Sequence, residues 1–346
     1  MAQIGREPVF FKRNRVFRVY KGGALFHDLM GDAQEDSYYP EEWIASAVRA
    51  INEGHDDPYE GISVTEDGML FSQLIEQYPR EMLGDRENPG VLVKFLDSAI
   101  RLPMQAHPTR AFSMEHFGSP YGKAEAWLIL ATRPDACIYF GFSRSLTRGE
   151  FSAAIDDSEV NPEAMTAFVN RCPVRTGDVF FVPAGVIHAI GAGCLILEVQ
   201  EPTDFTIQPE RWCGEYRLSD EAMYMGLDRE TAIDCFDFTR HGRNVLEDSR
   251  RHPVAVETGE GYVRYQLIGP ETTECFSMER LCVSGGTYTL APGAIYIVTE
   301  GSGTLTGENY ARFIGRGEYF FLPAMADGIR VTSEAGIELI RCAGGK

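Results

Sequence analysis

The chain after residue 91 consists largely of short apolar runs separated by turn residues. Gly, Pro, Asp or Arg bounds each run, as in VLVKFLDSAI, EAWLILAT, ACIYFGF and CLILEVQ. Many short strands at regular spacing are typical of a β-sandwich or β-barrel. After about residue 255 the chain returns to runs of the same kind and continues so to its end. The pattern predicts a mainly β protein with a second all-β unit in its C-terminal part.

A few stretches depart from this pattern and predict helices outside the β core. Apolar residues recur there at spacings of three and four, which is the spacing of one helix face. These stretches are residues 68–82, 146–170 and 219–236. In the last of them Ser219 and Asp220 are the expected N-caps. Residues 40–51 (PEEWIASAVRAI) fit a helix and a strand equally well.

One segment of the sequence occurs twice. Residues 177–190 read GDVFFVPAGVIHAI, and residues 317–330 read GEYFFLPAMADGIR. Both copies have a Gly-acidic turn, an apolar strand and a Pro-Ala pair that ends the strand. The second copy has Gly328 where the first has His188. We therefore expect two related β domains, at residues 1–218 and 255–346, joined by a short helical connection at 219–254.

Composition and charge exclude several classes of protein. The 346 residues include 51 Asp and Glu against 32 Lys and Arg, a formal charge of −19, which argues against binding to nucleic acid or to an anionic membrane. No apolar run is long enough to span a bilayer, and the charged N-terminus does not resemble a signal peptide. The eight cysteines are scattered without a CxxC pair, so we expect free thiols and a cytoplasmic location.

A small set of polar residues has the spacing of metal ligands. Gln105 and His107 are two residues apart, as are Lys123 and Glu125, so each pair shares one face of an extended strand. With His188 they form a mixed nitrogen and oxygen donor set that suits zinc, manganese, iron or nickel. The alternative is that QAH is a polar turn and His188 a core histidine, and spacing alone does not separate the two interpretations.

The motifs together identify a family resemblance. GDVFFVPAGVIHAIG matches the second motif of the cupin barrel, G-x5-P-x-G-x2-H, at every defined position. With VKFLDSAIRLPMQAHP, GKAEAW and the N-terminal KGG and EEWIASA segments, the chain resembles the class I mannose-6-phosphate isomerases of the cupin superfamily. The resemblance implies two cupin (jelly-roll β-barrel) domains with helical insertions, the second domain degenerate and without metal ligands.

The resemblance also implies an activity and a site. It implies zinc, one ion per chain, bound by Gln105, His107, Glu125 and His188, with Lys123 beside the sugar. The family interconverts mannose 6-phosphate and fructose 6-phosphate, so the expected partner is a small sugar phosphate and the expected protein a monomer or homodimer. Such a reaction moves a proton between C1 and C2 through an enediol, and Lys123 or His107 is the expected proton carrier.

One departure from the family pattern leaves other functions open. Family members have an arginine in a segment of the form S-D-x-x-x-R, where this chain has Gln208. Gln cannot supply the fixed positive charge of arginine, so either Arg211, three residues further on, takes that catalytic role or the substrate differs. The alternatives are an isomerase or epimerase of another sugar or sugar phosphate, and a non-catalytic sugar-binding metal cupin.

Overall fold

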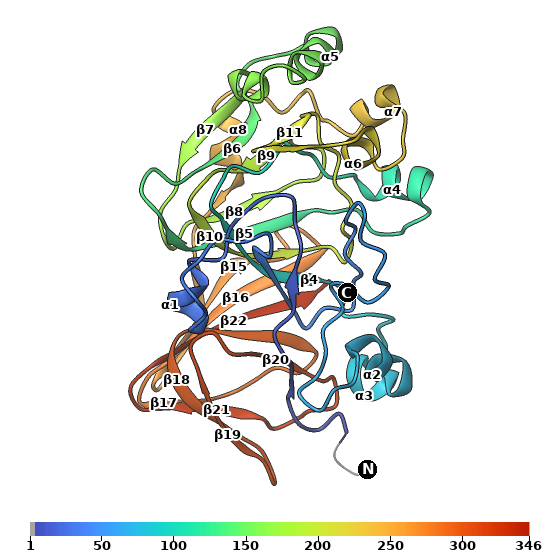
Figure 1. The fold of residues 1–346 in the computed structure, drawn as a ribbon. Helices are drawn as coiled ribbons and strands as arrows, with labels where there is room; N and C mark the ends of the chain where they lie inside the picture. Colours follow the sequence, from blue (N-terminus) through green and yellow to red (C-terminus); the bar gives the residue numbers. More distant parts are fainter. Residues whose placement is uncertain (1–3, 346) are drawn as a thin grey trace.

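The computed structural model describes residues 4–345 and confirms a mainly β protein (Figure 1). A seven-stranded antiparallel sheet, ordered β13-β8-β5-β10-β4-β3-β2, occupies the middle of the molecule. Its strands are β2 (Arg15–Val16), β3 (Glu41–Ile44), β4 (Leu92–Ser98), β5 (Glu125–Thr132), β8 (Val179–Val182), β10 (Cys194–Gln200) and β13 (Arg250–Arg251). A three-stranded sheet, ordered β7-β6-β9, lies above it in Figure 1 and contains β6 (Cys137–Phe142), β7 (Val169–Pro173) and β9 (His188–Ile190). Strands β11 (Trp212–Cys213) and β12 (Tyr216–Arg217) form a separate two-stranded sheet.

The C-terminal part forms a ten-stranded sheet in the lower half of Figure 1. Its strands are β14 (Val254–Gly259), β15 (Tyr262–Ile268), β16 (Phe276–Val283), β17 (Gly286–Thr289), β18 (Ala294–Thr306), β19 (Ala311–Gly315), β20 (Tyr319–Leu322), β21 (Arg330–Ser333) and β22 (Ile337–Gly344), together with β1 (Val9–Phe10). The N-terminal strand β1 pairs with β20 through Val9 and Phe321, so β1 belongs to the same sheet as the C-terminal strands.

A continuous apolar core joins the two large sheets. Val93 and Leu197 of the seven-stranded sheet and Ile297 and Ile340 of the ten-stranded sheet belong to one buried cluster. Strands β4 and β10 are buried along their whole length, which is why they have nearly uninterrupted apolar sequences. The predicted boundaries at residues 218 and 255 stay a prediction.

The helices are shorter than the sequence pattern suggests. They are α1 (Phe26–Met30), α2 (Phe71–Gln77), α3 (Pro79–Leu83), α4 (Arg110–Phe117), α5 (Arg148–Asp157), the 3-10 helix η1 (Ala164–Phe168), α6 (Asp220–Tyr224), α7 (Arg229–Ile233) and α8 (Asn244–Ser249). The helix expected over 68–82 is two helices, because Pro79 disfavours helical backbone at Tyr78, whose φ is −135° and ψ 56°. The hydroxyl of Ser219 accepts from the backbone N–H of Ala222, as its predicted capping role requires.

The two copies of the repeat have the same local structure. Gly177 and Gly317, with φ of 90° and 83°, occupy the left-handed region that favours glycine. Each precedes a buried four-residue strand, β8 in the first copy and β20 in the second. The repeated sequence therefore forms a repeated turn and strand, and only the first copy continues to a histidine.

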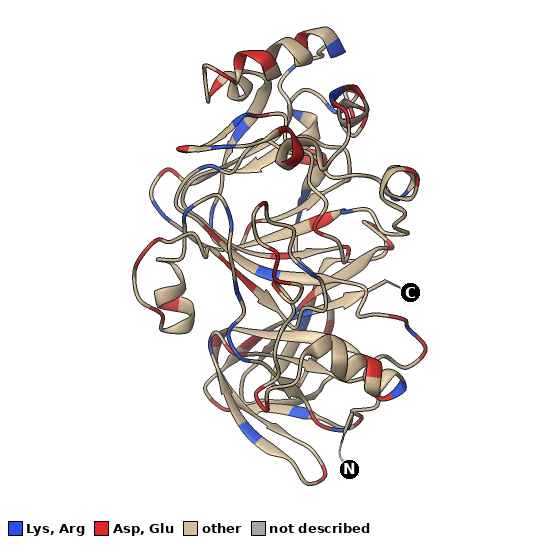
Figure 2. Ribbon diagram, turned by 45° about the vertical axis from the view of Figure 1, so that its right-hand side comes forward, with Lys and Arg blue, Asp and Glu red and all other residues tan. Residues whose placement is uncertain are grey.

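Charged residues occur throughout the described molecule, and its helices are short. Figure 2 shows acidic and basic residues along the ribbon of both large sheets and their connections. Within residues 4–345, no helix is both long enough and apolar enough to cross a membrane.

Candidate metal centre

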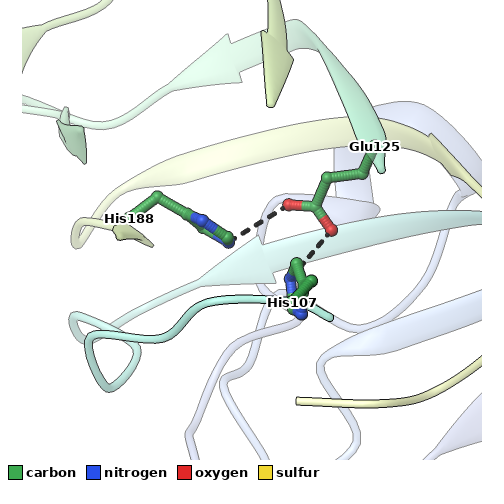
Figure 3. Close-up of side chains that lie close together, drawn as sticks. All are labelled: His107, Glu125 and His188. Carbon is green, nitrogen blue, oxygen red and sulfur yellow. Dashed lines mark ion pairs between the residues drawn. The ribbon is translucent and has the colours of Figure 1, made fainter. Parts of the chain in front are cut away.

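Two strands and the segment that follows an isolated β-bridge bring the side chains of the predicted site together (Figure 3). Glu125 is the first residue of β5 and His188 the first residue of β9, and His107 follows the bridge that Gln105 makes to His188. The backbone N–H of Gln105 donates to the carbonyl of His188, and the N–H of His188 donates in return to Gln105, each at 2.9 Å. Residues directly opposite in such a pair have their side chains on the same face of the sheet. The Gln105 side chain therefore lies on the His188 side.

His107, Glu125 and His188 form a buried cluster that can hold a metal ion. One ligand atom from each lies within 4.8 Å of the others. His107 Nε2 lies 3.1 Å from Oε2 of Glu125, and His188 Nε2 lies 3.3 Å from Oε1 of the same carboxylate. All three side chains are at most 1% exposed.

Backbone carbonyls orient both imidazoles. Nδ1 of His107 lies 2.9 Å from the carbonyl of Phe205, and Nδ1 of His188 lies 2.8 Å from that of Val186. Each Nδ1 is therefore the protonated nitrogen, and each Nε2 presents its lone pair to Glu125. Among residues 4–345, both carboxylate oxygens of Glu125 and Nε2 of His188 are buried without a hydrogen-bond partner. Electron-pair donors that converge in this way need a cation between them.

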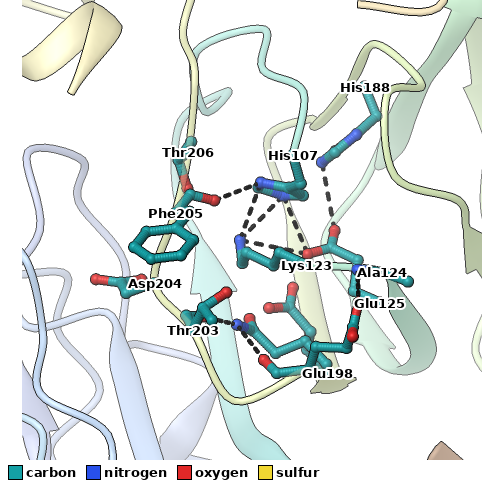
Figure 4. A network of polar contacts seen from close by, with 12 residues as sticks. His107, Lys123, Ala124, Glu125, His188, Glu198, Thr203, Asp204, Phe205 and Thr206 are labelled. Atoms are coloured by element: carbon teal, nitrogen blue, oxygen red, sulfur yellow. Dashed lines mark hydrogen bonds and ion pairs between the residues drawn. The ribbon is translucent and has the colours of Figure 1, made fainter. Parts of the chain in front are cut away.

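Lys123 adds a buried amine to the cluster (Figure 4). Its Nζ lies 3.0 Å from Nε2 of His107 and 3.4 Å from Oε2 of Glu125. Burial lowers the pKa of Lys123. Burial, together with the charge of Lys123, lowers the pKa of His107 to about 3, so this imidazole is neutral at physiological pH.

A cavity of about 430 Å³ opens beside the cluster. Gln105 and Lys123 line it, and so do seven charged residues that the sequence interpretation missed: Arg18, Glu41, Glu53, Lys94, Glu198, Asp204 and Glu221. Figure 4 shows Glu198 below Lys123 and Glu125. The sequence contains one indication of these residues. Lys94 and Glu198 each place a charge within an otherwise apolar run, VLVKFLDS and CLILEVQ.

Ion pairs connect the charged residues in this part of the cavity. Nζ of Lys94 lies 3.1 Å from Oε1 of Glu198 and 3.6 Å from Oε2 of Glu41. Oε2 of Glu198 also accepts from the indole N–H of Trp127 at 3.0 Å. Burial, and then the charge of Glu125, raise the pKa of Glu198. The polar lining therefore extends from the metal-ligand cluster along β4 and β10.

The structure does not bring Arg211 into the cavity lining. Its guanidinium donates to Asp220 at 2.7 Å and to the carbonyl of Leu218 at 2.9 Å, and its Nε lies 3.0 Å from Glu159. Gln208 does line the cavity, and its Nε2 donates to the carbonyl of Ala222 at 3.1 Å. The expected catalytic role of Arg211 thus has no support in the geometry.

Comparisons with known proteins agree with this fold. No family model matches the chain. The mannose-6-phosphate isomerase ManA of Bacillus subtilis is 29% identical over 333 residues, covering 92% of this chain and 93% of that protein. A crystal structure of the mannose 6-phosphate isomerase from Bacillus subtilis superimposes with a TM-score of 0.74 at 22% identity, covering 96% of this chain and 99% of that one. A mannose 6-phosphate isomerase bound with zinc and yttrium superimposes with a TM-score of 0.72 at 15% identity, covering 98% of this chain and 100% of that one.

The fold and the cluster define a cupin-type enzyme with a buried site for a metal ion. Within that class, the chain is similar over nearly its whole length to mannose-6-phosphate isomerases, as its sequence motifs indicate.

Proposed function

We propose that the protein is a metal-dependent aldose-ketose isomerase that interconverts mannose 6-phosphate and fructose 6-phosphate. The observation that carries the proposal is the buried cluster of His107, Glu125 and His188, with the Lys123 amine beside it at the edge of a cavity. The proposed substrate and reaction are those named for ManA of Bacillus subtilis, which matches 92% of this chain. We further propose a cytoplasmic location, which the eight free cysteines support.

The donor set fits zinc. His107, Glu125 and His188 would hold the ion, and Gln105, on the same face as His188, would supply an amide oxygen. Two imidazoles and one carboxylate are a common zinc set, and among residues 4–345 the buried oxygens of Glu125 have no hydrogen-bond partner. A structural neighbour bound with zinc supports the same choice. When bound, zinc supplies Lewis-acid polarisation of a carbonyl and stabilises an oxyanion.

Lys123 is the proposed proton carrier. Isomerisation removes the proton on C2 of the aldose and returns a proton to C1, so one group must accept and then donate. Burial lowers the pKa of Lys123, which increases the share of neutral amine able to accept a proton at Nζ. His107 is the other candidate from the sequence, but its Nε2 points at Glu125 and its Nδ1 is bonded to a carbonyl. The geometry therefore favours Lys123.

Lys94 and Glu198 are the proposed sugar-binding pair. Both line the cavity, and Nζ of Lys94 lies 3.1 Å from Oε1 of Glu198, so each is held in a fixed position beside the cavity. Paired donors and acceptors of this kind suit the hydroxyl groups of a sugar. They would orient the chain of carbon atoms relative to Nζ of Lys123.

A coupled assay with purified, zinc-loaded protein and mannose 6-phosphate tests the proposal. We expect turnover that a Gln105 and His188 double-alanine variant lacks. Equal rates for the two proteins would overturn the proposed function. A ligand-dependent thermal shift without turnover across a panel of sugar phosphates would instead support a non-catalytic binding cupin.

The replacement of the family arginine by Gln208 favours a second candidate, an isomerase or epimerase of a different sugar. Gln208 lines the cavity but offers no charge to a phosphate. Product analysis by NMR after incubation with each sugar separates the two candidates, since epimers and ketoses give different anomeric signals.

A further inference from the structure

Residues 104–107, here called the ligand segment, contain two of the predicted metal ligands and pair with other parts of the chain on both sides. On one side, Gln105 and His188 exchange two backbone hydrogen bonds, each of 2.9 Å. On the other side, Ala106 and Ile207 exchange two more, of 2.9 Å and 3.0 Å. Backbone N–H groups alternate in direction along an extended chain, so the segment can bond to a neighbour on each side.

The pairing between Ala106 and Ile207 cannot continue as a regular ladder. In an antiparallel ladder the next hydrogen-bonded pair lies two residues further along each chain, which places Met104 opposite Pro209. Proline has no N–H, so this pair cannot exchange two hydrogen bonds. The N–H of Met104 donates instead to Oε2 of the Glu210 side chain at 2.6 Å. Glu210 therefore supplies the acceptor at the point where the ladder ends.

Arg101 provides the counter-charge for this carboxylate. Its Nη1 lies 2.7 Å from the same oxygen, Oε2 of Glu210, and also donates to the carbonyl of Leu102 at 3.0 Å. The side chain of Glu210 is 1% exposed and that of Arg101 is 13% exposed. One buried oxygen thus joins the residues just before the ligand segment to the chain that follows Ile207.

The carboxylate of Glu210 is poorly satisfied for a buried group. Among residues 4–345, its Oε1 is buried without a hydrogen-bond partner. A buried ion pair with an unsatisfied oxygen stabilises a fold little more than apolar side chains of similar volume would. Its specific effect is therefore on the position of Met104, whose fully buried side chain lies with that of Ala106 in one apolar cluster.

The alternation of side chains transmits this position to the metal-ligand cluster. Met104 and Ala106 lie in the core, so Gln105 and His107 face the other way along the extended segment. Gln105 lines the cavity, and Nε2 of His107 lies 3.1 Å from Glu125. A shift of the backbone at Met104 would therefore move both predicted ligands relative to Glu125.

We infer that Glu210 is a positioning residue for the metal centre, because its hydrogen bond with the N–H of Met104 fixes Gln105 and His107 in place before the ion binds. The inference rests on the metal binding in the proposed function and adds a residue outside the motifs that indicate the site. Glu210 acts through the backbone rather than by contact with the ion. Groups that orient metal ligands in this way typically change metal affinity by about 10- to 100-fold when they are removed.

Two double variants that both remove the ion pair test the inference. Arg101→Met with Glu210→Leu removes the acceptor for Met104, whereas Arg101→Met with Glu210→Gln keeps an amide oxygen that can accept from the same N–H. Competition with a chelator measures the zinc dissociation constant of each metal-free protein. We expect it to rise about tenfold or more in the Leu variant and less than about threefold in the Gln variant. Equal dissociation constants in the two variants would overturn the inference.

A matched ion pair elsewhere controls for a general loss of stability. Asp178 accepts from Nη1 of Arg250 at 2.6 Å and from the backbone N–H of Arg175 at 2.9 Å, the same two kinds of donor that Glu210 has. Arg250→Met with Asp178→Leu should change the zinc dissociation constant by less than about threefold, whatever its effect on stability. A rise of about tenfold in this variant as well would overturn the assignment to Glu210.

Hydrogen exchange of the unmodified, metal-free protein keeps the inference testable if the Leu variant does not fold. We expect the amide of Met104 to exchange slowly without zinc, because its hydrogen bond to Glu210 is buried and already formed. An amide that becomes protected only when zinc is added would overturn the inference. Failure of the unmodified protein to bind zinc would instead overturn the metal-dependent function proposed above, and the exchange of Met104 would still decide the inference.

Discussion

Nε2 of His188 lies 3.3 Å from Oε1 of Glu125, and both atoms are buried without a hydrogen bond. The N–H of the same imidazole is directed to a backbone carbonyl, so the lone pair of Nε2 faces a carboxylate oxygen. This arrangement is unfavourable for two acceptors by themselves and favourable around a cation. It leads to a prediction about metal content.

His188→Ala should lose stoichiometric metal binding, because it removes one nitrogen ligand and the remaining set binds zinc more weakly. Elemental analysis after dialysis measures the metal content directly. The matched control is His252→Ala, which changes a histidine outside the cluster and should keep one ion per chain. Full metal content in both variants would show that His188 is not a ligand. Circular dichroism of each variant confirms that it is folded.

Lys123→Met should lower kcat by about a hundredfold or more, since general acid-base groups contribute factors of that size. The substitution keeps the length and most of the volume of the side chain but removes the amine that lies 3.0 Å from Nε2 of His107. Lys12→Met is the control, because Lys12 is exposed on the N-terminal segment and should keep full activity. A Lys123→Met variant that keeps both its metal and its activity would contradict the proposed role of Lys123.

The sequence predicts the parts of this protein that local rules determine. The strands of the core follow from their apolar runs, and the turn at Gly177 follows from the repeat that it shares with Gly317. The grouping of His107, Glu125 and His188 as metal ligands is implied by the family resemblance, since spacing alone leaves it open, and the structure brings these three side chains together. Helix ends were predicted less well, because the break before Pro79 depends on a single residue.

Long-range pairing accounts for what the sequence did not reveal. Val9 pairs with Phe321 across most of the chain, and no periodicity within either segment indicates the partner. Lys94 and Arg18 face one cavity because β4 and the N-terminal segment meet through Glu41, which again is a tertiary relationship. Arg211 shows that closeness in sequence does not imply closeness in space. It lies three residues after Gln208, but its charge is not in the cavity lining.

Glu41 should make stability depend on pH. Burial alone raises its pKa, but the charges of Arg18 and Lys94 and hydrogen bonds from Trp43 and Tyr20 outweigh burial and hold the pKa of Glu41 well below its usual range. A carboxyl with a depressed folded pKa stabilises the protein above its unfolded pKa, and this stabilisation is lost as the pH falls. Glu41→Gln should therefore cost about 3–5 kcal/mol at pH 7.

Urea unfolding at several pH values checks the Glu41 prediction. The difference in unfolding free energy between the unmodified protein and Glu41→Gln should shrink below about pH 4.3, by about 1.4 kcal/mol per pH unit. Glu76→Gln on α2 is the control, because that side chain is exposed and its substitution should change stability by less than about 0.5 kcal/mol. A difference that stays constant with pH would contradict the assignment to Glu41.

Arg211→Ala and Arg217→Ala should have similar activities. This comparison distinguishes the observed geometry, in which Arg211 lies outside the cavity lining, from the family pattern, which would give Arg211 a catalytic role. Both guanidiniums pair with Glu159, and that of Arg211 also pairs with Asp220, in an ion-pair cluster that does not line the cavity. The substitutions therefore remove only partly exposed ion pairs, each worth about 0.2–1 kcal/mol. The kcat/KM values of the two variants on mannose 6-phosphate should then lie within about threefold of the unmodified enzyme. If Arg211→Ala alone lost most of its activity, the loop that carries Arg211 would have to reach the substrate during turnover, and the paired geometry would describe the resting enzyme only.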